Sequence, residues 1–95
     1  MLVVYLSLGE YRIMNKSNLT SNQERLRYLL KQIRLEAGLT QRAIAESLGH
    51  PQSYVSKYEM GERRLDIVEV QLICKSVGIS LTEFATRFER LCDET

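Results

Sequence analysis

Apolar residues recur at helical spacing along most of the chain, and each apolar stretch is bounded by residues that cap helices. The pattern is clearest over residues 21–38, where a Ser-x-x-Glu capping box comes first and a glycine comes last. Between them, apolar side chains recur at the i, i+3, i+4, i+7 and i+11 positions of one helix face. These side chains are Leu26, Leu29, Leu30, Ile33 and Ala37. The stretch predicts an amphipathic helix.

Two shorter helices are predicted next. Thr40 can cap a helix over residues 40–49, which Gly49 ends. Pro51 suits the first position of a helix over residues 51–60, because a backbone donor is not needed there. Since only a short turn separates these two helices, we expect them to cross at a steep angle.

Two longer helices follow, over residues 66–78 and 80–91, and each begins with a capping box. The capping pairs are Asp66 with Glu69 and Ser80 with Glu83. On the apolar side of the first helix we expect Leu72, Ile73 and Val77, and on that of the second Leu81, Phe84, Ala85, Phe88 and Leu91.

Together these elements predict a compact all-α domain of five helices over residues 21–95. A chain of 95 residues, 44% of them hydrophobic, is long enough for one core. Residues 1–20 form a short apolar N-terminal arm, whose apolar run is too short to span a membrane. The arm is either an edge strand that pairs with a second copy or a non-native extension before a second plausible start at Met14.

Little in the sequence supports catalysis or metal binding. There is one histidine, and the two cysteines, Cys74 and Cys92, have no further Cys or His at metal-ligand spacing. No Gly-rich phosphate loop is present either. We therefore expect no enzyme activity, no metal and no cofactor. Reduced cysteines are typical of a cytoplasmic protein.

Charge is distributed unevenly, although the formal net charge is only +1. Residues 24–64 hold 8 Lys and Arg against 5 Asp and Glu, whereas residues 65–95 hold 3 against 6. A basic middle favours an anionic partner.

The two short helices carry small and branched residues at helix-turn-helix spacing. Ala45 leaves room for the following helix, Gly49 permits the positive φ of a tight turn, and Val55 fills the gap from the second helix. The text IRLEAGLTQRAIAESLG followed by HPQSYVSKYEMGER, with LICKSVGISLTEF downstream, resembles the Xre or lambda-repressor-like helix-turn-helix family over about residues 24–88. The resemblance implies a five-helix fold and DNA binding.

The outward side of the helix over residues 51–60 suggests how DNA is read. With Val55 and Tyr58 toward the core, four polar residues face outward, where they can contact base edges in the major groove. These candidates are Gln52, Ser53, Ser56 and Lys57. Glutamine can bond adenine through two hydrogen bonds. The alternative is that all four are ordinary solvated residues.

Phosphate contacts are expected around this helix. The resemblance matches Gln41 to a family position that binds the DNA backbone, and a helix N-terminus favours an anion. In similar domains the arginine that matches Arg34 forms an ion pair with the glutamate that matches Glu59; a direct phosphate contact is the alternative for Arg34. Further phosphate candidates are Arg42, Tyr54, Arg63 and Arg64, unless these are only solvated residues.

We therefore predict a sequence-specific transcriptional regulator, a repressor, that binds a pseudo-palindromic site in double-stranded DNA as a homodimer in the cytoplasm, at the nucleoid. Candidate dimer contacts are Phe88 and Leu91, unless both complete the core, and then the arm residues 2–8. One alternative is an antitoxin-type protein that neutralises a partner toxin and autoregulates its operon. A controller of a restriction and modification system also fits.

Overall fold

Five α-helices make up the part of the chain that the structure describes. The computed structural model describes residues 19–94, so the N-terminal arm predicted from the sequence lies almost wholly outside this range. The helices are α2 (Asn22–Glu36), α3 (Gln41–Leu48), α4 (Gln52–Met60), α5 (Ile67–Val77) and α6 (Leu81–Glu94). The all-α fold class expected from the sequence is confirmed. Within the described range, no helix has the length and apolarity that crossing a membrane requires.

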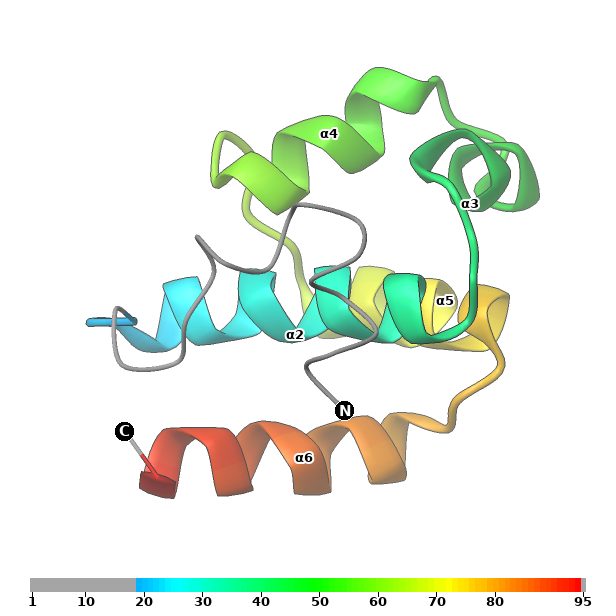
Figure 1. The fold of residues 1–95 in the computed structure, drawn as a ribbon. Coiled ribbons are helices and arrows are strands. Elements are labelled where there is room, and N and C mark those ends of the chain that lie inside the picture. The colour runs from blue at the N-terminus through cyan, green and yellow to red at the C-terminus, as the bar shows by residue number, and fades with distance from the viewer. Residues whose placement is uncertain (1–18, 95) are drawn as a thin grey trace.

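Helix α2 lies between α4 and α6 and packs against both (Figure 1). Helix α6 runs in the opposite direction to α2 in this view, and α5 packs against α3 and α6. Helix α3 is seen nearly end-on while α4 runs across the picture (Figure 1). The steep crossing of α3 and α4 expected from their short connection is therefore present.

Four of the helices begin directly after the capping residues predicted from the sequence. Ser21 and Asp66 each form a capping box with the glutamate three residues later. Thr40 and Ser80 each accept a hydrogen bond from the backbone N–H three residues later. Pro51 differs from the expectation, because its ψ of 157° is extended and makes it the N-cap of α4 instead of its first helical residue.

The core is formed by one stripe from each helix. Its most completely buried side chains are Leu30, Ile33, Ile44, Val55, Tyr58, Ile73 and Cys74. Three residues assigned to apolar stripes from the sequence lie outside the core: Leu72 is 49% exposed, and Ala37 and Ala85 are exposed as well. For Leu72 the reason is helix geometry, because the buried stripe of α5 follows the i, i+3, i+4 positions that begin at Val70.

Candidate DNA-binding face

The first residues of α3 and α4 meet at the crossing of the two helices. Ala45 and Val55, which pack at this crossing, are 1% and 0% exposed. Gln41 begins α3 and Gln52 begins α4, and the side-chain nitrogen Nε2 of Gln52 donates to Oε1 of Gln41 at 3.4 Å. The helix-turn-helix arrangement therefore brings two glutamines together at one edge of the domain.

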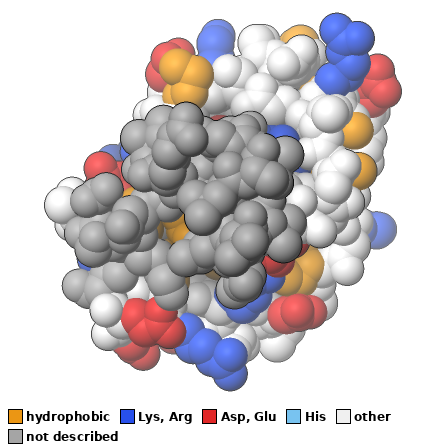
Figure 2. All heavy atoms as spheres, viewed as in Figure 1, with side chains coloured by type: hydrophobic (Ala, Val, Ile, Leu, Met, Phe, Trp, Pro, Cys, Tyr) orange, Lys and Arg blue, Asp and Glu red, His pale blue; other side chains and the backbone are white. Residues whose placement is uncertain are grey.

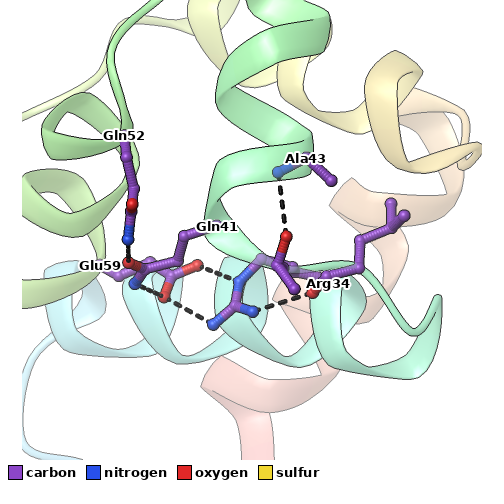
Figure 3. Close-up of polar contacts among 7 residues, drawn as sticks. Arg34, Gln41, Ala43, Gln52 and Glu59 are labelled. Atoms are coloured by element: carbon purple, nitrogen blue, oxygen red, sulfur yellow. Dashed lines mark hydrogen bonds and ion pairs between the residues drawn. The ribbon is translucent and has the colours of Figure 1, made fainter.

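A buried ion pair joins the end of α4 to α2 beneath these glutamines (Figure 3). Arg34 donates from Nε to Oε2 of Glu59 at 2.8 Å and from Nη2 to Oε1 at 3.0 Å. A third donor of Arg34, Nη1, bonds the backbone carbonyl of Leu39 at 2.9 Å. The two side chains are only 9% and 3% exposed. The ion pair that the family resemblance implies for Arg34 is thus present, and its guanidinium faces the protein interior.

The carboxylate of Glu59 fixes the orientation of both glutamine amides. An ionised carboxylate only accepts hydrogen bonds, so Gln41 must direct its NH₂ group toward Glu59, as it does at 3.0 Å. The carbonyl oxygen of Gln41 then faces Gln52 and takes the donor of that residue. Figure 3 shows the resulting chain from Arg34 through Glu59 and Gln41 to Gln52. Gln52 keeps its own Oε1 and a second N–H for an outside partner.

The remaining base-contact candidates lie along the outer side of α4, opposite the buried Val55 and Tyr58. Ser53 and Lys57 are exposed. Ser56 is half-buried, and its hydroxyl donates to the sulfur of Met60 at 3.5 Å. The face that turns away from the core is therefore polar from Gln52 to Lys57, and the exposed Met60 follows it.

Tyr54 lies in a cluster that joins α4 to the loop after it and to α5. Its ring stacks on His50 with 4.1 Å between centroids, and the guanidinium carbon of Arg63 lies 4.9 Å from the Tyr54 ring centroid. Glu69 accepts from the hydroxyl of Tyr54 at 3.3 Å and from the guanidinium of Arg63. Two phosphate candidates, Tyr54 and Arg63, thus have partners within the chain. Arg63 is still exposed, as are Arg64 and Arg42.

The charges of this cluster reinforce one another. The pKa of Glu69 is lowered most by a hydrogen bond from the backbone N–H of Asp66. The hydrogen bond from the guanidinium of Arg63 lowers it further. The hydrogen bond to Glu69 in turn raises the pKa of Arg63, while burial raises the pKa of the Tyr54 hydroxyl. Arg63 therefore stays charged and Tyr54 stays neutral near pH 7, and the loop after α4 is held against α5.

A shallow hollow opens beside the two glutamines, between the end of α2 and the starts of α3 and α4. Its polar lining includes Lys31, Gln41, Arg42 and Gln52. The sequence did not single out Lys31. Its spacing of three from Arg34, which puts both on one side of α2, was the available signal. Figure 2 shows basic side chains next to acidic ones along the upper edge of the molecule, where α4 lies in Figure 1.

The dimer candidates at the end of α6 are less accessible than the sequence suggested. Leu91 is 5% exposed and belongs to the core, and Phe88 is partly buried against it. Their burial within one chain matches the alternative that the sequence left open, because α6 closes the lower side of the domain (Figure 1).

The fold and this face are those of a helix-turn-helix domain, and comparison with known proteins gives its family. Residues 30–84 match the family HTH_3, described as helix-turn-helix. The chain is similar to an XRE-family like protein from Pseudomonas syringae pv. tomato str. DC3000, with 38% identity, a TM-score of 0.70, and coverage of 74% of this chain and 85% of that one. This chain therefore belongs to the XRE-type helix-turn-helix family of DNA-binding transcriptional regulators.

Solved structures of a restriction-modification controller protein, C.Esp1396I, are also similar. The wild-type protein matches with 26% identity and a TM-score of 0.74, over 81% of this chain and 100% of that one. The structure of its tetramer in complex with its natural 35 base-pair operator matches with 27% identity and a TM-score of 0.70, over 77% of this chain and 96% of that one. No sequence among the curated proteins matches this chain.

Proposed function

We propose that this protein is a repressor that reads a pseudo-palindromic operator by placing α4 of each of two copies in the major groove. The observation that carries the proposal is the orientation of Gln52, which the contact to Gln41 sets. In the major groove adenine presents an N6–H donor beside the N7 acceptor. The outward Oε1 and N–H of Gln52 match that pair, so we assign Gln52 to adenine.

The other outward residues of α4 complete the reading surface. Ser53 can donate to or accept from a base, and Lys57 can reach guanine or a phosphate. Ser56 is the weakest base contact of the four, because its hydroxyl already bonds Met60. These residues would decide the sequence that is bound.

Phosphates would bind on either side of α4. The hollow at the start of α3 offers Lys31, Gln41 and Arg42, and the free backbone N–H groups of the helix end favour an anion there. On the other side, the exposed Arg64 is the stronger candidate, because Arg63 and Tyr54 are held by Glu69. Such contacts position the domain without reading sequence.

Two copies related by a twofold axis place their recognition helices about 34 Å apart, which is one turn of DNA. Binding of that kind over a promoter would exclude the polymerase, in the cytoplasm where the DNA lies. The operator-bound tetramer of the similar controller protein supports assembly of several copies on DNA. The family consists of DNA-binding domains, which supports a role without catalysis.

The test is binding to the DNA upstream of the protein's own gene, compared with a scrambled duplex over a series of salt concentrations. Gln52→Ala should weaken binding to the specific duplex alone, by about 1–3 kcal/mol. Arg64→Ala should weaken both duplexes and lower the salt slope by about one. Gln23→Ala, at an exposed position in the first turn of α2, serves as the matched control. Equal affinity of the native protein for both duplexes would contradict the proposal.

A more specific role is favoured by the structural similarity to C.Esp1396I, namely control of a restriction-modification system. Neighbouring genes for an endonuclease and a methyltransferase would support this role. A gene for a small toxic protein in the same operon would instead support the antitoxin alternative, in which the toxin is the protein partner.

A further inference from the structure

Helix α5 presents apolar side chains to solvent on the side that faces away from the core. Ile67 is 70% exposed, Val68 59% and Leu72 49%. Together with the exposed Gln71 and Lys75 they form one face, here called the α5 face. Three large apolar side chains this exposed on a helix of 11 residues indicate a contact surface.

The α5 face begins beside the recognition helix. Glu69, in the first turn of α5, accepts from the hydroxyl of Tyr54, which lies in the first turn of α4. The same carboxylate holds Arg63 in the connecting loop. Helix α5, which carries this face, is therefore joined to the first turn of α4 by one hydrogen bond and to the connecting loop by one ion pair.

We propose that the α5 face is the dimer interface, and that its partner is the α5 face of a second copy in antiparallel orientation. The inference rests on the proposed function, in which two copies bind one operator. In a twofold-symmetric interface the same surface faces itself, so each contact occurs twice. Antiparallel α5 helices centred on the turn that contains Gln71 place Val68 of each copy against Leu72 of the other.

Charge complementarity supports this orientation. Asp66 caps the N-terminal end of α5, and Lys75 lies near its C-terminal end. The antiparallel arrangement sets Lys75 of each copy opposite Asp66 of the other, whereas a parallel arrangement sets like charges side by side. Antiparallel helices also bring the positive end of each helix dipole near the negative end of the other.

The surroundings of Leu72 extend the surface toward α3. Leu72 lines a shallow hollow with Ser47, Leu48, Lys75 and Ser76. Side chains of the second copy can enter this hollow and enlarge the apolar contact. Because the apolar area is still modest, we expect a reversible dimer that the operator stabilises.

The first experiment measures the dimer dissociation constant by sedimentation equilibrium. Val68→Glu puts two like charges in the interface and should raise the constant about a hundredfold. Ala85→Glu places the same charge on the exposed side of α6 and should leave it unchanged. Val4→Glu tests the N-terminal arm in the same way. Circular dichroism should show equal helix content in all four proteins.

A second measurement does not depend on weakening the dimer. Gln71→Cys places a thiol close to the proposed axis, so oxidation should give a covalent dimer in high yield. Thr82→Cys, at an exposed position of α6, is the matched control and should give little.

The outcomes separate this inference from the proposed function. If the native protein is a dimer and Val68→Glu leaves it so, the α5 face is not the interface, although the operator proposal stands. Dissociation by Ala85→Glu or Val4→Glu instead would assign the interface to α6 or to the arm. If the native protein stays monomeric with and without operator DNA, the inference and the dimeric part of the proposed function both fail.

Discussion

The carboxylate of Glu59, near the end of α4, accepts a hydrogen bond of 3.0 Å from the side chain of Gln41, at the start of α3. Glu59 also pairs with the buried Arg34, and Gln41 also accepts a hydrogen bond from the base-contact candidate Gln52. Glu59 therefore has two roles, since it neutralises Arg34 and orients the amides of Gln41 and Gln52.

We expect Glu59→Gln to destabilise the fold by about 3–5 kcal/mol, because it leaves the guanidinium of Arg34 buried without its counter-charge. Urea unfolding measures the change. Glu36→Gln is the control, since its ion pair with Arg87 is 30% exposed on both sides and should cost about 1 kcal/mol or less. Equal losses of unfolding free energy for the two variants would show that burial does not make the Arg34–Glu59 pair more important for stability than the exposed pair.

Gly49, Gly61 and Gly78 end helices in the left-handed conformation, and the first two differ in their surroundings. Gly49 has φ +73° with nothing within 4 Å of an added Cβ, whereas at Gly61, φ +87°, that atom would lie 2.8 Å from the guanidinium carbon of Arg27. Gly49→Ala should cost about 1–2 kcal/mol from backbone strain alone. Gly61→Ala should cost a similar amount, because the atoms that its Cβ would meet are the far end of a flexible side chain that can shift. Urea unfolding of the native protein and the two variants measures both losses; a clearly larger loss for Gly61→Ala that Arg27→Ala recovers would show that Arg27 cannot move aside.

Burial raises the pKa of the Cys74 thiol to about 11, and the thiolate is the form that reacts. At pH 8 we expect an alkylating reagent to modify the half-buried Cys92 while Cys74 stays protected. Denaturant should expose both. Mass spectrometry of digested protein distinguishes the two sites, and rapid labelling of Cys74 in the folded protein would show that α5 opens readily.

Stability should decrease in acid through Glu69. Its pKa in the folded protein lies below the ordinary 4.5, so its contribution is complete above pH 4.5 and is lost as pH falls through the lowered value. Glu69→Gln keeps a side chain suited to the capping box but removes the charge that faces Arg63. The difference in unfolding free energy between native protein and variant should be constant near pH 7 and shrink below pH 4.5. A difference that persists to pH 3 would contradict this assignment.

Much of the fold could be predicted because its signals are local. Capping side chains lie three residues from the N–H groups they bond, as for Ser21 and Thr40, so the sequence alone shows them. The steep crossing of α3 and α4 follows from a short connection and from the small side chain of Ala45. Leu72 was misassigned because an apolar residue beside a buried one looks like core, whereas the helix turns it outward.

The site was harder to predict, because its contacts join residues far apart in the chain. Glu59 and Gln41 are 18 positions apart, and Tyr54 and Glu69 are 15 apart. No periodicity relates such pairs, and only packing brings them together. The pair of Arg34 with Glu59 was accessible through the family resemblance. The assignment of individual residues to bases and phosphates stays a prediction.

Helix α4 carries core residues on one side and the proposed base-reading residues on the other. Val55 and Tyr58 are buried on one side, while Ser53 and Lys57 are exposed on the other. Substitutions at the exposed pair should leave the core intact, so under the proposed function they would change the preferred operator without the need for compensating mutations. Gln52 is the exception, because a change there also removes a partner of Gln41. Evolution of specificity should therefore be fastest in the middle of α4 and slowest at its first residue.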